Sequence, residues 1–267
     1  AFEYSEKYNT PVLFRPTTRV CHAYASIDNC DSPSPKKYEG FVKDSKKWVI
    51  FPRLSFANHI MIEKRNVEIG KDFSTYSANK AEGVNSEKAV VTSGISYAYT
   101  KECLKDYPDV KLIKIATAYP FPEDFVLSSL EGAKEVLCIE ELSPFIEEQI
   151  LKLAGKHGLQ LKVSGKLDGK VQAGGENSTD KIAAILGEFL GKDFTAEGYD
   201  LSDAPALPVR PPVLCAGCPH RASFYAVKQA MKGRKAYFCG DIGCYTLGNA
   251  MPLDMVDTCL CMGAGIT

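Results

Sequence analysis

Between residues 88 and 190, short apolar runs alternate with longer amphipathic ones, and this alternation constrains the fold more than any other feature. The apolar runs predict strands, and the amphipathic runs predict helices because their apolar side chains recur every three to four residues. Strands that alternate with helices need right-handed crossovers, so the pattern predicts an α/β domain with a mostly parallel sheet over 86–192. We expect strands at 88–94, 110–117, 134–141 and 159–166, and helices at 95–107, 122–133, 143–158 and 179–190.

The segments around this domain have a different character. Residues 29–85 are polar and basic, which predicts a connecting arm with a short helix at 59–69. We expect Trp48 and Phe51 to anchor this arm on a neighbour. Ahead of the arm, the run PVLFR at 11–15 has the pattern of a strand.

A second linker is predicted over 193–212 because it ends in the proline-rich run PALPVRPP, and proline favours extended backbone. A new domain then begins, with a helix at 220–233 that stops at Gly233 and a strand and turn at 235–243.

Charge and hydropathy exclude several classes of protein. Lys plus Arg (32) nearly cancel Asp plus Glu (33), so no basic field indicates nucleic acid or an anionic membrane as a partner. No apolar run approaches the roughly 20 residues that a bilayer span needs. Six of the ten cysteines crowd after residue 213. Such crowding is typical of metal or redox chemistry in a reducing cytoplasm, whereas Cys138, in an apolar run, is expected to be an inert core thiol.

The run CAGCPHR at 215–221 places Cys215 and Cys218 on a turn before a helix, where thiol pKa values fall. His220 and Arg221 would add positive charge nearby. Iron–sulfur ligation, zinc ligation and a redox pair all remain open, and Cys239 and Cys244 would supply further soft ligands. The simplest alternative is that these thiols pack at a glycine-rich turn and bind nothing.

The run CGDIGCYTLG at 239–248 predicts backbone exposed at the carboxyl edge of a parallel sheet, where ligands of α/β folds bind. Asp241 could bind a ligand, although its spacing favours capping of the next helix. Tyr245 and Leu247 would line a pocket or simply pack. Met262 would wedge against a flat ring or pack at a helix start.

Glu140 and Glu141 end the strand predicted at 134–141. They could pair with a cation, but a solvated strand end is the simplest interpretation of two adjacent carboxylates at this position.

Together, the runs CAGCPHR, DIGCYTLG and DTCLCMGAGI, with TTRVCH and FPEDF upstream, resemble the large, thiamine diphosphate-binding subunit of the indolepyruvate ferredoxin oxidoreductases. The resemblance implies an internal piece of a larger polypeptide. It divides the chain into the tail of a pyrimidine-type thiamine-binding domain (1–30), a connecting arm (31–85), a transketolase C-terminal-like domain (86–192), a linker (193–212) and the start of a pyrophosphate-type thiamine diphosphate-binding α/β domain (213–267).

The resemblance also implies a reaction. Aryl pyruvates such as indolepyruvate would be oxidatively decarboxylated, with ferredoxin as the electron acceptor and coenzyme A as the acyl acceptor. The implied cofactors are thiamine diphosphate, Mg²⁺ and [4Fe–4S] clusters that lie mainly in a C-terminal domain. The implied protein partners are a small subunit and ferredoxin, in the cytoplasm.

Residue by residue, the resemblance implies that Met262 holds the cofactor bent and that Gly263 lies beside its rings. Residues that would flank the thiazolium ring and the substrate are Asp241, Ile242, Gly243, Cys244 and Tyr245. Cys215, Cys218 and Cys244 match three ligands of the cluster nearest the cofactor in related pyruvate enzymes. The catalytic glutamate and the Mg²⁺–diphosphate motif are expected outside this sequence, so the piece alone is expected to be inactive. Two alternatives are another 2-oxoacid as substrate and a non-enzymatic zinc or assembly module.

Overall fold

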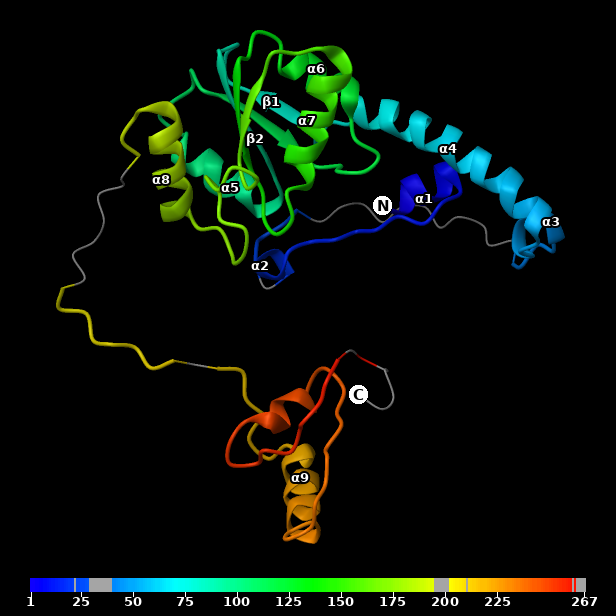
Figure 1. Cartoon of the computed structure of the whole chain (residues 1–267), viewed down its shortest axis with the longest axis vertical. Coiled ribbons are helices and arrows are strands. Elements are labelled where there is room, and N and C mark those ends of the chain that lie inside the picture. The colour runs from blue at the N-terminus through cyan, green and yellow to red at the C-terminus, as the bar shows by residue number, and fades with distance from the viewer. Residues whose placement is uncertain (22, 29–39, 195–201, 210, 261, 263–267) are drawn as a thin grey trace. The chain divides into compact units, whose positions relative to one another are not determined.

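The computed structural model describes residues 1–21, 23–28, 40–194, 202–209, 211–260 and 262. The chain forms two compact units, Ala1–Gly198 and Tyr199–Thr267 (Figure 1). The division falls inside the segment 193–212.

The first unit is built on a five-stranded sheet with the order β1-β3-β2-β4-β5. Four strands are parallel, namely β2 (Lys88–Ser93), β3 (Lys111–Ile115), β4 (Glu135–Ile139) and β5 (Lys162–Ser164). The register places Val90 of β2 opposite Leu112 of β3 and Leu137 of β4. A short strand that the sequence did not predict, β1 (Lys80–Glu82), pairs antiparallel with β3. The predicted α/β class with a mostly parallel sheet is therefore confirmed.

Helices cover both faces of this sheet (Figure 1). On one face, α6 (Glu123–Ser129) and α7 (Phe145–His157) pack over Ala89 and Val91 of β2. On the other face, α5 (Gly94–Cys103) and α8 (Thr179–Leu190) lie over Val90. Because successive strand residues point to opposite faces, a continuous apolar run such as AVV fills both cores.

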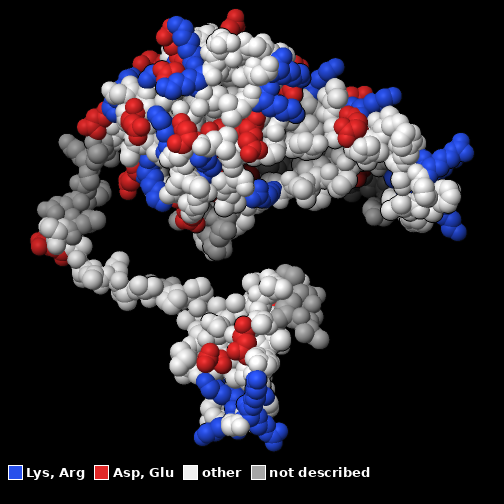
Figure 2. Space-filling model, in the orientation of Figure 1, with Lys and Arg blue, Asp and Glu red and all other residues white. Residues whose placement is uncertain are grey.

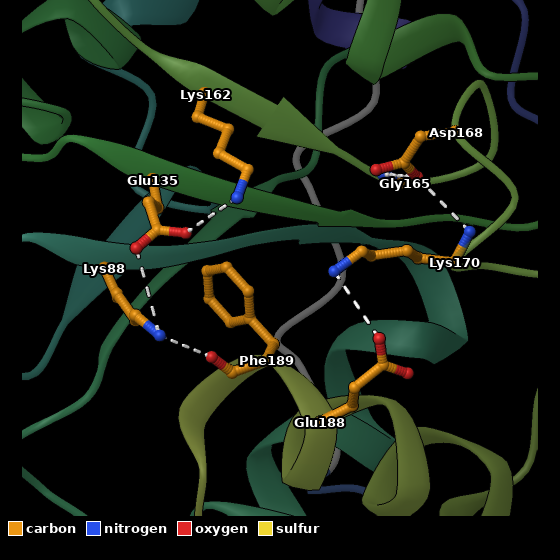
Figure 3. A network of polar contacts seen from close by, with 8 residues as sticks. All are labelled: Lys88, Glu135, Lys162, Gly165, Asp168, Lys170, Glu188 and Phe189. Carbon is orange, nitrogen blue, oxygen red and sulfur yellow. Dashed lines mark hydrogen bonds and ion pairs between the residues drawn. The ribbon is translucent and has the colours of Figure 1, made fainter.

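Polar contacts at the strand starts and on the α8 side hold this layer together (Figure 3). The Lys88 ammonium donates to the Phe189 carbonyl near the end of α8 at 2.6 Å and lies 3.9 Å from the Glu135 carboxylate. Lys162 pairs with the other oxygen of Glu135 at 3.6 Å. Over the visible face of the first unit, charges of both signs are interspersed (Figure 2). Because the ion pairs of Glu135 with Lys88 and Lys162 are partly exposed, solvent screens them. The contacts of Lys88 therefore position α8 more than they stabilise the fold.

Helix ends follow the sequence in part. The Ser178 side chain caps α8 by accepting from the Lys181 N–H, and Gly158 ends α7 in the left-handed conformation (φ 64°). No side chain at the cap position bonds to the start of α7. The Glu140 carboxylate accepts from the N–H groups of Ile146 (2.9 Å) and Glu147 (3.0 Å) instead, so the first turn is capped from the end of β4.

The amino-terminal part differs from expectation. Residues 11–15 form no strand, and the helices are α1 (Phe2–Tyr8), α2 (Thr18–Cys21), α3 (Ser45–Trp48) and α4 (Pro52–Ser74). Helix α4 runs well beyond the predicted 59–69, since Pro52 suits a first turn and no other proline or capping signal interrupts it. The side chains of Trp48 and Phe51 remain 53% and 64% exposed, so they do not anchor the arm within the described residues.

Helix α1 attaches to α4 through polar contacts at its carboxyl end. Asp72 accepts a hydrogen bond from the Tyr8 hydroxyl at 2.6 Å and pairs with Lys7. The Arg65 guanidinium donates to the carbonyls of Tyr8 (3.3 Å) and Asn9 (3.1 Å). A cation at the negative end of α1 is favourable, so these contacts hold the amino-terminal segment against the arm.

The second unit contains α9 (Pro219–Ala230) and a 3₁₀ helix, η1 (Thr246–Asn249), around a small core of Leu214, Phe224 and Met255. The strand predicted within 235–243 is wrong, because among the described residues this segment forms no strand and has one isolated bridge, from Cys239 to Thr258. Gly233 is not the helix stop either, since α9 ends at Ala230 with Met231 as its cap. Among the described residues, no helix has both the length and the apolarity to cross a bilayer.

Candidate functional site

The CxxC segment forms a tight turn at the start of α9, as its sequence predicts. The Cys218 N–H donates to the Cys215 carbonyl at 3.2 Å, and Gly217 occupies the left-handed region (φ 71°) that the turn requires. Pro219 then opens the helix, where its missing N–H costs nothing. The turn therefore holds Cys215 and Cys218 at the positive end of α9.

Arg221 reaches back from the first turn of α9 to brace this turn. Its Nε donates to the Cys215 carbonyl at 3.0 Å, and its Nη2 donates to the Leu214 carbonyl. The sequence suggested that Arg221 adds charge near the thiols. In the structure its donors serve two successive carbonyls at the start of the turn, so its main role is to hold the loop against the helix.

The two thiols of the turn have different surroundings. Cys215 is exposed, whereas Cys218 is half-buried, with its Sγ 3.3 Å from the His220 Nδ1. The His220 ring meets the edge of Tyr245 at a centroid distance of 5.2 Å, and the Phe224 ring lies 5.9 Å from Tyr245. Tyr245 comes from the 239–248 run, so the structure brings the two cysteine-bearing motifs together.

The backbone of the second motif is fixed from both sides. The Gly240 N–H donates to the Thr258 carbonyl at 2.9 Å. The Thr246 hydroxyl donates to the Asp241 carbonyl at 3.0 Å and lies 3.2 Å from the Cys259 Sγ. The loop 240–246 is thereby pinned beside the segment that leads toward Met262.

Asp241 does not cap the following helix. Tyr245 occupies the cap position of η1 and no side chain bonds there, so the capping interpretation is wrong. The Oδ1 of Asp241 is buried and accepts no hydrogen bond from any described residue. A buried acceptor without a donor costs about 1–3 kcal/mol, which is why such atoms are uncommon in folded proteins.

Several apolar side chains of the second unit are exposed. Ile242 is 47% exposed, Tyr245 51% and Met262 76%, while Leu247 packs on the core of the unit. The Cys244 thiol is exposed too. Gly243 adopts φ 114°, and no atom would meet a Cβ there within 4 Å. Gly263 lies outside the described residues.

The predicted cluster ligands are not gathered. Within the part of the chain that the structure describes, no group of three or more His, Cys, Asp or Glu side chains is placed to hold a metal ion. The described geometry therefore does not assemble Cys215, Cys218 and Cys244 around one centre, and iron–sulfur ligation there stays a prediction.

A pair of buried carboxylates in the first unit was missed by the sequence analysis. Glu140, read as a solvated strand end, is only 4% exposed because it caps α7, and that interpretation is wrong. Burial raises the pKa of Glu140, although the N–H groups of Ile146 and Glu147 partly offset it. Glu147 is 1% exposed and accepts from the N–H groups of Lys166 (2.7 Å) and Leu167 (3.2 Å).

The Cys138 thiol lies beside this pair, and its predicted role as an inert core thiol is confirmed. It is fully buried, and burial raises the pKa of the thiol well above its ordinary value. Both the carboxylates and the thiol therefore serve the fold of this unit.

Comparison with known proteins supports the resemblance seen in the motifs. No family model matches the chain. Curated relatives named as subunit IorA of indolepyruvate oxidoreductase are 35% identical in Thermococcus kodakarensis, 36% in Methanothermobacter thermautotrophicus and 33% in Pyrococcus horikoshii. Each match covers 100% of this chain but only 43%, 44% and 43% of the relative, so the chain spans less than half the length of these proteins. The similarity to subunit IorA extends over the whole of this chain.

Among solved structures, a 2-oxoglutarate:ferredoxin oxidoreductase from Magnetococcus marinus, with 2-oxoglutarate, coenzyme A and succinyl-CoA bound, matches with a TM-score of 0.37. The match is 15% identical and covers 52% of this chain and 23% of that chain.

Proposed function

We propose that this chain is part of the large subunit of an enzyme that oxidatively decarboxylates aryl pyruvates such as indolepyruvate. Ferredoxin would accept the electrons, coenzyme A would take the acyl group, and a small subunit would complete the enzyme. The observation that carries the proposal is the similarity of the full chain to curated subunits of that name. We also propose a cytoplasmic location, which fits the eight described cysteines, none of which is in a disulfide.

The loop 240–246 has features that a site for thiamine diphosphate requires. The buried Oδ1 of Asp241 is an acceptor that still needs a donor, and the exposed side chains of Ile242 and Tyr245 offer apolar surface to a flat ring. Gly243 leaves room for close approach. We therefore assign to the coenzyme the loop residues Asp241, Ile242, Gly243, Cys244 and Tyr245, together with Met262 and Gly263.

When bound, thiamine diphosphate supplies the electron sink that decarboxylation of a 2-oxoacid needs. The chain's own residues would orient it. Asp241 would accept a hydrogen bond from an amino or hydroxyl group of the ligand. Ile242 and Tyr245 would exclude water and so strengthen that bond. In this proposal Mg²⁺ and the [4Fe–4S] clusters are held mainly by residues outside this sequence.

The test uses the full-length polypeptide that contains this chain, together with its companion subunit, under anaerobic conditions. Reduction of a viologen dye should require indolepyruvate, thiamine diphosphate and coenzyme A together, and the absence of dye reduction would refute the proposal. Parallel assays with phenylpyruvate, pyruvate and 2-oxoglutarate decide the substrate, since a preference for a non-aryl acid would favour the alternative enzyme. One zinc per chain, without iron or labile sulfide, would favour the non-enzymatic alternative.

The substitution Asp241→Asn tests the assigned residue. The Asn side chain keeps an acceptor oxygen but loses the charge, and a charged hydrogen bond is worth about 1–1.5 kcal/mol more than a neutral one, so the dissociation constant of thiamine diphosphate should rise roughly 5- to 13-fold. Calorimetric titration of the coenzyme measures this change independently of turnover. The control is Asp254→Asn, an exposed carboxylate of the same unit, which should leave the constant unchanged. Equal constants for the two variants would remove Asp241 from the site.

A further inference from the structure

His220, at the start of α9, has no part in the proposed function, yet it lies between the two cysteine-bearing motifs. It is half-buried and directly follows Pro219, the first residue of the helix. Its ring and that of Phe224, four residues later, share one face of α9, with centroids 6.4 Å apart. Phe224 belongs to the core of the second unit and is 8% exposed, whereas His220 is not a member of that core. The contacts of His220 therefore point to a role other than filling the core.

The orientation of the His220 ring is set at its Nδ1 atom. Nδ1 lies 3.3 Å from the Sγ of Cys218, a distance at which a thiol and an imidazole share a hydrogen bond. Cys218 is held in turn, because its N–H donates to the Cys215 carbonyl and its side chain packs on the core of the unit. The CxxC turn therefore fixes the position of the imidazole.

The His220 ring also contacts Tyr245, which lies in the loop 240–246. The two ring centroids are 5.2 Å apart and the ring planes meet at 81°, which is the edge-to-face arrangement that aromatic rings favour. The Phe224 ring makes a second edge-to-face contact with Tyr245 at 5.9 Å. Two rings of α9 thus hold one part of the Tyr245 side chain, while about half of it stays exposed.

Tyr245 lies at the carboxyl end of the exposed part of this loop. Residues 242–244 are exposed, and the backbone is hydrogen-bonded on either side of them. Before them, the Gly240 N–H donates to the Thr258 carbonyl at 2.9 Å. After them, the Tyr245 carbonyl accepts from the Gly248 N–H at 2.9 Å. A contact that fixes the Tyr245 side chain therefore limits the conformations open to an exposed stretch of three residues.

We propose that His220 is a positioning residue for the coenzyme: its ring holds the side chain of Tyr245, and thereby the loop 240–246, in the conformation that receives thiamine diphosphate. This inference rests on the proposed function, in which Tyr245 offers apolar surface to the coenzyme. His220 acts through Tyr245 and does not itself contact the ligand. A loop that is ordered in advance loses less entropy when the ligand binds, so the His220 ring raises the affinity.

The first test measures binding of thiamine diphosphate by calorimetry in the full-length polypeptide assembled with its companion subunit. His220→Ala removes the ring, and the dissociation constant should rise about fivefold, within the roughly 2- to 13-fold range that an edge-to-face pair contributes. His220→Asn keeps a polar atom near Cys218 without a ring and should behave like His220→Ala. His220→Phe keeps a ring without the bond to the thiol, and its constant should lie closer to that of the parent.

The matched control is Tyr225→Ala, which removes a ring of the same helix that is 61% exposed. It should leave the dissociation constant unchanged. Binding by His220→Phe that is as weak as binding by His220→Ala would show that the ring contact does not position the loop, and would overturn the proposal.

A double mutant separates action through Tyr245 from direct contact with the coenzyme. Tyr245→Ala should itself weaken binding, because it removes surface that is assigned to the ligand. In that background, adding His220→Ala should change the dissociation constant by less than about twofold, since the ring no longer has a side chain to hold. Two losses that simply add would mean that His220 acts by another route, and the proposal would be wrong.

The third test needs no coenzyme and separates positioning from stability. Hydrogen exchange followed by mass spectrometry compares the segment 240–248, where the Gly240 and Gly248 N–H groups are hydrogen-bonded, with the segment 222–230 of α9. In His220→Ala, exchange should become about fivefold faster in 240–248 and stay unchanged in 222–230. Unchanged exchange in 240–248 contradicts the proposal. So does faster exchange in both segments, which would show that His220 stabilises the unit as a whole.

The outcomes for the proposed function and for His220 are distinguishable. A parent complex that binds no thiamine diphosphate would refute the proposed function and the positioning role with it. A parent that binds the coenzyme, with a His220→Ala variant of equal affinity, would overturn the role of His220 alone and leave the proposed function standing.

Discussion

The buried Glu147 provides the sharpest prediction about stability. Its Oε2 accepts from the N–H of Lys166, which is buried, and from the N–H of Leu167, and so joins α7 to the loop after β5. The substitution Glu147→Ala removes both bonds and leaves a cavity at a side chain that is 1% exposed. A buried N–H without an acceptor, here that of Lys166, costs about 1–3 kcal/mol, and the partly buried N–H of Leu167 adds less. We expect a loss of about 2–4 kcal/mol, a large share of the roughly 5–15 kcal/mol of an ordinary domain.

The neighbouring Glu148 is a matched control, because it lies in the same first turn but is exposed. Glu148→Ala removes only the favourable interaction of an acidic side chain with the helix start, about 0.3–1 kcal/mol. Urea unfolding followed by far-ultraviolet circular dichroism measures both variants. If Glu147→Ala costs no more than Glu148→Ala, the bonds to the loop contribute nothing and the reasoning fails.

A double mutant sharpens the same prediction. A Cβ on Gly165 would lie 2.6 Å from the Glu147 Oε2 and 2.8 Å from its Cδ, so Gly165→Ala must displace the carboxylate. Once Glu147 is already alanine, that clash is gone. The double mutant should therefore lose clearly less than the sum of the two single losses. Simple additivity would show that the Glu147 carboxylate does not lie against Gly165.

Further predictions concern packing and pH. Gly248→Ala would place a Cβ 2.5 Å from the Phe224 ring and should cost about 1–3 kcal/mol. Gly155→Ala, inside α7 with open space around it, should stabilise by about 0.5–1 kcal/mol; thermal melts of the two variants should move in opposite directions. Burial raises the pKa of Glu140 above its ordinary value of 4.5. The stability that this raised pKa gives to the folded state is therefore fully present below pH 4.5 and is lost as pH rises through the pKa of the folded state. Urea unfolding from pH 4 to 8 should show this decline in the parent and not in Glu140→Gln, and parallel curves would contradict it.

Local signals in the sequence were enough for most of the sheet domain. The run AVV at 89–91 is apolar without interruption, as the centre of a strand buried on both faces must be. Helix α8 matches its prediction because Ser178 and Gly191 mark both ends in the sequence itself. These features depend on the residues within one turn or one strand, so no knowledge of distant neighbours was needed.

Features that depend on distant neighbours could not be predicted. Residues 11–15 have the period of a strand but lack a ladder, and a strand exists only with a partner. The polar run Lys80–Glu82 has no strand pattern in its sequence, yet it forms a strand because β3 supplies a partner for pairing.

In the candidate site, the sequence predicted the CxxC turn, but not the bonds from Arg221 to the backbone of that turn. Nor could spacing show that the Oδ1 of Asp241 is buried without a donor.

The sheet of the first unit ends on both sides in a strand of three residues, β1 on one rim and β5 on the other. Such short edge strands expose few unpaired amide and carbonyl groups to another polypeptide. The charged residues Lys80 and Glu82 of β1 further disfavour the addition of a strand. The long apolar strands at the centre, which would polymerise if they stood at an edge, are thereby kept out of reach. This border lets a strongly β-forming core exist in a crowded solution without seeding fibrils.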